Sequence, residues 1–121
     1  MQPMKLVSLF PIVIAICSLS SAQASDWTQL QGDASRSGNA PGEILKTPLG
    51  LVAAVPLTDG VQAAPVVADG VVYVIDGSGV VFAIDTQTFK VKWRFATKGG
   101  AGNCNNVAAP AVVGKYLHLG T

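Results

Sequence analysis

Cysteine is scarce in this chain of 121 residues, which contains only Cys17 and Cys104. Cys17 lies in an apolar amino-terminal run that we expect to be removed as a secretory leader. The remaining chain then holds one cysteine, so an internal disulfide is excluded, and Cys104 could pair only with a cysteine elsewhere in a longer chain. Without disulfides the fold must rely on an apolar core, although burial is inefficient in short chains.

A surplus of charge of either sign is also absent. The sequence has 8 Lys and Arg residues against 7 Asp and Glu residues, for a formal net charge of +1. One of these cations, Lys5, belongs to the leader, so the remaining chain is balanced. This balance indicates no electrostatic capture of an anionic membrane, and nucleic acid is not expected as a partner.

Long apolar runs are confined to the amino terminus. Lys5 gives a positive start, Leu6–Leu19 is almost continuously apolar, and small residues follow at Ala22 and Ala24. This layout predicts a helical signal peptide over residues 1–24 that is cleaved after Ala24. We therefore expect an exported bacterial protein, either periplasmic or secreted.

Two other interpretations of this run are weaker. A membrane-spanning helix needs about 20 apolar residues, whereas this run is shorter and contains Pro11. A lipid-anchored cysteine needs a small residue before it, and Cys17 follows the large Ile16. Cys17 is therefore interpreted as apolar filler of the leader, and no transmembrane span is expected after leader removal.

Helical periodicity is almost absent after the leader, and this absence favours an all-β class. Residues 25–48 form a polar segment rich in Gly and Ser, which predicts loops. Residues 49–121 form the β-rich region. Leu49–Leu57 opens this region as a predicted short strand, with Pro56 near its end.

The predicted strands that follow are closely spaced: Ala63–Ala68, Val71–Ile75, Val80–Ile84 and Val91–Ala96. Their connections are short and include Asp-Gly, the strongest short hairpin signal, so they are predicted to form one up-and-down antiparallel sheet. The last strand alternates, which predicts Val91, Trp93 and Phe95 on one face and Lys92 and Arg94 on the other.

The pattern then restarts. The run "AAPVV" from Ala63 returns as "AAPAVV" from Ala108, and Pro65 matches Pro110 at a spacing of 45. Repeats of about 40–45 residues with four strands each indicate a β-propeller, whose ring has roughly four to eight blades. The chain would hold one blade and the start of the next, with Leu49–Leu57 as a candidate outer strand of a closing blade. We therefore expect an incomplete fragment, partnered by the missing blades of a longer chain or by another protein.

The third turn and the fourth strand read AIDTQTFKVKW. This stretch resembles the pyrroloquinoline-quinone (PQQ) repeat, Ala-x-Asp-x-x-Thr-Gly-x-x-x-Trp. The matching positions are Ala83, Asp85, Thr88 and Trp93, and Phe89 replaces the glycine. The resemblance implies a PQQ-repeat propeller in which these residues form a structural motif. Asp85 and Thr88 suit hydrogen bonds within a tight turn. Trp93 suits an apolar contact with a neighbouring blade, and Ala83 suits close approach of the blades.

The most unusual loop runs from Thr97 to Val107. Its candidate ligand-binding or partner-binding residues are Gly99, Gly100, Asn103, Cys104, Asn105 and Asn106. The alternative is a loop held only by asparagine turn chemistry. A catalytic pair of Cys104 and His118 is not favoured, because His118 lies in a predicted strand where the preceding repeat has Tyr73. No catalytic residue and no metal ligand set is predicted.

The resemblance implies two functional classes. One class comprises non-catalytic scaffold or adaptor propellers, including a lipoprotein that assists outer-membrane protein assembly. The other comprises quinoprotein dehydrogenases, which hold PQQ with a calcium ion and oxidise alcohols or sugars. We favour a non-catalytic binding or scaffold protein of the periplasm or cell envelope, with no cofactor in this chain. PQQ and calcium belong to the alternative, a fragment of a dehydrogenase. A product without a function of its own is a third interpretation.

Overall fold

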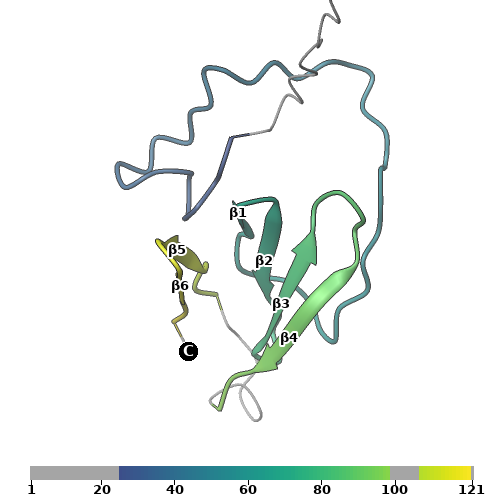
Figure 1. The fold of residues 1–121 in the computed structure, drawn as a ribbon, viewed down its shortest axis with the longest axis vertical. Coiled ribbons are helices and arrows are strands. Elements are labelled where there is room, and N and C mark those ends of the chain that lie inside the picture. The colour runs from purple at the N-terminus through teal and green to yellow at the C-terminus, as the bar shows by residue number, and fades with distance from the viewer. Residues whose placement is uncertain (1–24, 99–106, 121) are drawn as a thin grey trace, which may run out of the picture.

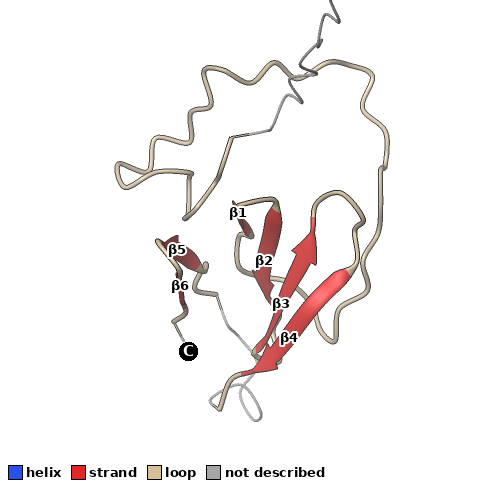
Figure 2. Ribbon diagram, in the orientation of Figure 1, coloured by secondary structure: helices blue, strands red, loops and turns tan. Residues whose placement is uncertain are grey.

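A computed structural model describes residues 25–98 and 107–120, and the secondary structure within these ranges is entirely β (Figures 1 and 2). The strands are β1 (Val66–Ala68), β2 (Val71–Ile75), β3 (Val80–Asp85), β4 (Val91–Ala96), β5 (Ala111–Val113) and β6 (Tyr116–His118). The predicted all-β class is confirmed. Within the two described ranges, no helix is long and apolar enough to cross a membrane.

Strands β1 to β4 form one antiparallel sheet in the order of the sequence, which is the predicted blade. The β1–β2 turn is built by Asp69 and Gly70, which have φ angles of 49° and 70°. Positive φ at both central residues is the requirement of a type I′ turn, the turn that suits the twist of a hairpin. The backbone N–H and the hydroxyl of Thr86 both donate to the carbonyl of Gly70, at 3.0 and 2.9 Å. These two bonds join the β1–β2 turn to the turn between β3 and β4.

Two predicted strands are wrong in extent or in kind. The first strand of the blade starts at Val66 and not at Ala63, because Pro65 has no N–H to donate to a neighbouring strand. Leu49–Leu57 forms no strand at all, since it has no hydrogen-bonded strand beside it among the described residues. It runs instead as an extended loop.

The second hairpin, β5–β6, repeats the register of the first. Val66 pairs with Tyr73 in β1–β2, and Ala111 pairs with His118 in β5–β6, so each partner is displaced by 45 residues. Gly114, with a φ of 57°, takes the place of Asp69 in the turn. The predicted repeat is thus present in the backbone as well as in the sequence, and β5 lies against β1 (Figure 1).

The blade sheet is apolar on both faces. One face, which we call the hairpin face, is built on Ala63, Ile75 and Val81 and is covered by Leu117 and Leu119 from the second hairpin. The other, which we call the loop face, is covered from outside the sheet by the loop that precedes β1. Its buried residues are Val74, Phe82 and Ile84, and the covering residues are Val55 and Leu57. The sheet is therefore the middle layer between the second hairpin and this loop.

Strand β4 alternates as predicted from Trp93 to Phe95, but the prediction is wrong for Val91. Trp93 pairs with Ala83, Val91 pairs with Ile84, and a bulge lies between these pairs. Neighbouring residues of β3 point to opposite faces, and directly paired residues share a face. Trp93 therefore lies on the hairpin face, whereas Val91 lies on the loop face, because the bulge inserts an extra residue between them.

The amino-terminal segment, residues 25–48, is joined to both hairpins. The backbone N–H and carbonyl of Trp27 each form a 2.8 Å hydrogen bond with Val67 in β1. The next carbonyl, that of Thr28, accepts from the N–H of Val112 in β5 at 2.8 Å. Two consecutive residues of this segment thus connect the first strand of the blade to the first strand of the second hairpin.

This packing predicts a large effect for Ile75, which is fully buried on the hairpin face next to the second hairpin. Ile75→Ala removes apolar volume that the surroundings can refill only in part. We expect it to lower the free energy of unfolding by about 2–5 kcal/mol. Urea unfolding followed by tryptophan fluorescence measures this loss.

The matched control is Ile44→Ala, because Ile44 is the same residue type at 85% exposure. Its effect should stay within about 0.5 kcal/mol of zero. Similar losses for the two variants would contradict the assignment of Ile75 to the core between the sheets.

Candidate functional site

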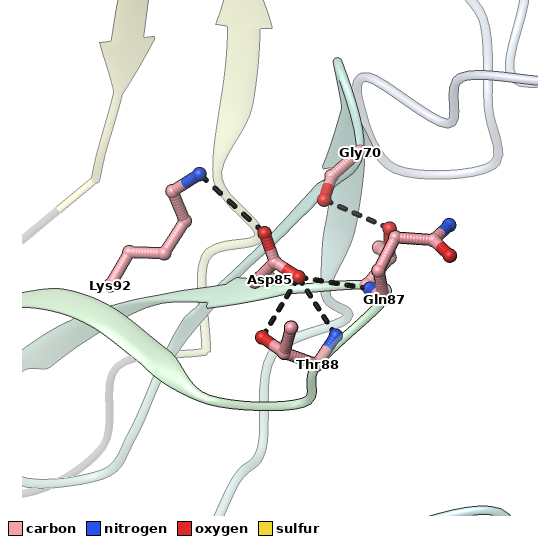
Figure 3. Close-up of polar contacts among 6 residues, drawn as sticks. Gly70, Asp85, Gln87, Thr88 and Lys92 are labelled. Carbon is pink, nitrogen blue, oxygen red and sulfur yellow. Dashed lines mark hydrogen bonds and ion pairs between the residues drawn. The ribbon is translucent and has the colours of Figure 1, made fainter.

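The turn between β3 and β4 is organised by the carboxylate of Asp85 (Figure 3). Its Oδ1 accepts hydrogen bonds from the backbone N–H groups of Gln87 and Thr88, at 3.0 and 2.8 Å, and from the hydroxyl of Thr88 at 2.9 Å. Its Oδ2 lies 3.6 Å from the ammonium of Lys92. The bonds from Thr88 chiefly hold the pKa of Asp85 below its ordinary value, with a smaller contribution from the charge of Lys92. Asp85 is therefore held ionised as a turn acceptor.

Phe89 occupies the position where the PQQ repeat has glycine. Its φ is 55°, in the left-handed region that glycine enters without strain. Its backbone N–H donates to the carbonyl of Asp85 at 2.9 Å, so the turn closes in the same way without the glycine. A side chain in this region costs on the order of 1–2 kcal/mol. Phe89 thus adopts, at an energetic cost, a conformation that glycine adopts without strain.

The other two motif residues, Ala83 and Trp93, belong to a row across the hairpin face. Ala83 pairs with Tyr73 on one side and with Trp93 on the other, and it is fully buried. The rings of Tyr73 and Trp93 are 5.9 Å apart between centroids and are tilted by 46°. A side chain larger than alanine would occupy the space between the two rings.

A cavity of about 190 Å³ opens between this aromatic row and the second hairpin. Tyr73 and Trp93 line it from the blade sheet, and Lys115 and Tyr116 line it from the hairpin. The ammonium of Lys115 lies 5.4 Å from the centre of the Tyr116 ring, within cation–π range. Asp69 lines it as well, so the cavity presents one carboxylate and one ammonium beside aromatic and aliphatic side chains. These groups suit contact with a side chain of another polypeptide.

Asp76 is a site residue that the sequence analysis did not single out. It is fully buried, and its carboxylate accepts five hydrogen bonds. The donors are the N–H and hydroxyl of Thr58, the N–H of Asp59, the hydroxyl of Ser78 and the N–H of Val80. It thereby binds the loop before β1 to the β2–β3 turn. The signal available in the sequence was the Asp-Gly-Ser-Gly run, which combines an acceptor with two glycines.

Burial raises the pKa of Asp76, but the hydrogen bonds from Thr58, Ser78 and Val80 outweigh it and leave the pKa below its ordinary value. The carboxylate is therefore ionised in the folded chain at neutral pH. The described neighbours of the carboxylate donate to it, the hydroxyls of Thr58 and Ser78 included, so Asp76 serves as a structural acceptor that joins two turns.

The remaining candidates are not brought together by the described structure. His118 lies in β6, pairs with Ala111 of β5 and is exposed. Gly99, Gly100, Asn103, Cys104, Asn105 and Asn106 lie outside the described residues, so the proposed loop site stays a prediction. Within residues 25–98 and 107–120, no three His, Cys, Asp or Glu side chains group together so as to hold a metal ion.

Among residues 25–98 and 107–120, the described carboxylates of the blade do not form the oxygen cage that a calcium-bound quinone needs. Such a site needs several free carboxylate or amide oxygens around a hard cation. The two best-placed carboxylates of the blade, Asp76 and Asp85, already accept hydrogen bonds from their own turns. The donor chemistry of the described blade is therefore that of a structural repeat.

The strand order and the repeated register define a class, namely part of a β-propeller with one four-stranded blade and the first hairpin of the next. A PQQ-repeat family model, described as outer membrane protein assembly factor BamB, matches residues 51–121. This match spans more than half of the chain, and the chain therefore belongs to this PQQ-repeat family of propeller-type envelope proteins. The comparison with curated proteins gives no match.

The Asp76 network predicts a pH-dependent loss of stability on substitution. Asp76→Asn replaces one acceptor oxygen by an NH₂ donor that faces N–H and O–H donors. We expect it to cost about 1–3 kcal/mol at pH 7. Because the folded-state pKa of Asp76 is lowered, its contribution is present above the ordinary aspartate pKa of about 3.9 and is lost as the pH falls through the folded value. The difference in the free energy of unfolding between the wild type and Asp76→Asn, measured by urea unfolding, should therefore become smaller below about pH 4.

Asp69→Asn is the matched control, because Asp69 is an exposed turn residue with positive φ, a conformation that asparagine tolerates. It should leave the urea midpoint almost unchanged at every pH. If the Asp76→Asn deficit were constant from pH 7 to pH 3, the ionised carboxylate would not be what holds the loop to the turn.

Proposed function

We propose that this chain is a non-catalytic binding or scaffold component of the bacterial cell envelope, which holds an extended segment of a partner protein along β4. The observation that carries this proposal is the exposure of β4. All six residues of this strand are exposed, whereas β2 and β3 are largely buried. The outermost strand of the blade is thus the part of the sheet that remains free for a partner.

Strand β4 has the properties of a surface that accepts another strand. It is an edge of the blade sheet, so one side of its backbone has no strand neighbour among the described residues. Its aromatic side chains Trp93 and Phe95 are 43% and 59% exposed. An extended peptide that adds to a sheet edge gains backbone hydrogen bonds, and side-chain contacts give it specificity. Exposed edges without such a partner favour unspecific association.

The charges along β4 indicate the kind of segment that fits. Arg94 pairs with Phe82 and therefore lies on the loop face, opposite Trp93. Lys90 precedes the strand and is exposed. An extended segment with apolar side chains on one face and acidic side chains on the other complements this edge. Lys92 contributes less, because its ammonium already lies near Asp85.

The family match supports a role in handling proteins. The matching model is described as an outer membrane protein assembly factor, and assembly requires contact with other polypeptides. The predicted signal peptide over residues 1–24 supports the same cellular location. We therefore place the proposed activity in the envelope, in the binding of partner proteins and not in oxidation of a small substrate.

Site-specific photo-cross-linking in bacterial cells tests this function. A benzoylphenylalanine at position 95, in the full chain with its leader, should cross-link to a partner protein. The matched control places the same photoreactive residue at Val52, which is apolar and 80% exposed but lies outside the sheet. Cross-linking at position 95 should exceed the control several-fold, and Arg94→Glu should reduce it, because the added acid repels an acidic segment.

Two outcomes would contradict the proposal. Equal yields at positions 95 and 52 would show that exposure alone determines the contact. A cross-link confined to one longer polypeptide would show that further blades of the same chain cover β4. The dehydrogenase alternative has its own readout, since purified protein would then carry the absorbance of bound quinone.

A further inference from the structure

Ser25 and Glu43 close the amino-terminal segment into a loop. The backbone N–H of Ser25 donates to Oε1 of Glu43 at 3.0 Å, and the hydroxyl of Ser25 donates to the same oxygen at 3.0 Å. These two residues are 18 positions apart, so the contact joins the beginning of the segment to its far end. Both side chains are exposed.

Ser25 is also the residue that follows the predicted cleavage position. The small residues Ala22 and Ala24 at the end of the leader predict cleavage after Ala24. Cleavage there converts the amide nitrogen of Ser25 into a free α-amino group. This group has an ordinary pKa of about 7.7–8.0 and carries a positive charge at neutral pH. The sequence pattern and the side-chain geometry therefore point independently to the same nitrogen atom.

We propose that Glu43 binds the α-ammonium of Ser25 after leader removal, so that processing of the chain fastens its amino-terminal segment. Before cleavage the bond from the Ser25 nitrogen joins a neutral amide to a carboxylate, so only the acceptor is charged. After cleavage both partners are charged, and the Coulomb attraction of an ion pair adds to the hydrogen bond. Cleavage thus strengthens an existing contact without requiring the chain to move.

The surroundings of Ser25 favour a cation. The residues that line a cavity of about 360 Å³ beside it include the acidic residues Asp26, Asp33 and Glu43, and no Lys or Arg of the described chain. Asp26 already accepts from the N–H of Asp69 at 3.1 Å, and Asp33 accepts from the backbone and hydroxyl of Ser37. Glu43 is therefore the carboxylate whose described hydrogen bonds all come from Ser25. These two bonds hold its pKa below the ordinary value, the one from the backbone nitrogen most of all.

The residues that follow Ser25 explain why its position matters. Asp26 is bonded to the β1–β2 turn, Trp27 to β1 and Thr28 to β5. An amino terminus held by Glu43 is thus immediately followed by three residues that connect the blade to the second hairpin. Leader removal would in this way be coupled to the docking of the two hairpins.

The test uses the full chain expressed with its leader and recovered after export. Intact mass and amino-terminal sequencing should show that it begins at Ser25. The pH dependence of acylation of the α-amine, followed by mass spectrometry, then gives the pKa of that group. An opposite unit charge about 3 Å away in water raises an amine pKa by about one unit. We expect this increase in the wild type.

Glu43→Gln separates charge from hydrogen bonding, because glutamine keeps an acceptor oxygen in the same place. It should return the α-amine to its ordinary pKa and so increase its acylation rate at pH 7.5 several-fold. Asp33→Asn is the matched control, since Asp33 lines the same cavity without contacting Ser25. It should leave the pKa of the α-amine raised.

A raised α-amine pKa also makes the folding stability of the processed chain depend on pH. An amine whose pKa is raised on folding contributes stability that is present below its unfolded pKa, near 8, and that is lost as the pH rises through the folded value. The urea midpoint of the wild type should therefore fall above about pH 8, and that of Glu43→Gln should not.

A mature terminus other than Ser25, or equal α-amine pKa values in wild type and Glu43→Gln, would overturn the proposal. If Asp33→Asn lowered the α-amine pKa as much as Glu43→Gln does, the proposal would also be overturned, because the pKa increase would then come from the combined negative charge of the nearby acids and not from Glu43.

Discussion

The blade sheet is apolar on both faces, and the rest of the structure depends on covering them. Antiparallel sheets commonly leave one face to water, but β3 has four successive buried residues, Val81–Ile84, and so needs cover on each side. The chain supplies that cover from two directions. Leu117 and Leu119 come from the second hairpin, and Val55 and Leu57 come from the loop before β1. A blade of this kind is a layer between neighbours, which is why repeats of this type are stable only in contact with one another.

Local turn chemistry made most of the fold predictable from the sequence. Asp69-Gly70 can form the type I′ turn that joins β1 to β2, and the repeated Ala-Ala-Pro run places the second hairpin at the same offset that its register shows. These signals are contained within a few neighbouring residues. The predictions that were wrong concern contacts between residues that are distant in the sequence. Leu49–Leu57 has the composition of a strand but no strand beside it in the part of the chain that the structure describes. The β4 bulge depends on how that strand meets β3.

The candidate site shows the same division. Asp85 and its turn partner Thr88 could be identified from a motif of eleven residues, because the turn that they build is local. Asp76 could not, because two of its donors, Thr58 and Asp59, precede it by 18 and 17 residues. A buried carboxylate is retained only when its neighbours together offset the cost of leaving water. A sequence pattern can therefore place Asp76 in a turn, but it cannot identify the distant loop to which its carboxylate is hydrogen-bonded.

Strands β2 and β3 are largely buried, whereas every residue of β4 is exposed, and this difference connects the fold to the proposed function. Trp93 follows Tyr73 and Ala83 across the hairpin face, in the same row, and lines the cavity beside the second hairpin, but 43% of it stays exposed. The pattern that packs one repeat against the next therefore continues to an open edge. Under the proposed function, a polypeptide that presents an apolar strand would pair with this edge through backbone and side-chain contacts like those within the blade. Discrimination among such strands would then come from charge, for which Arg94 lies on the loop face of the same strand.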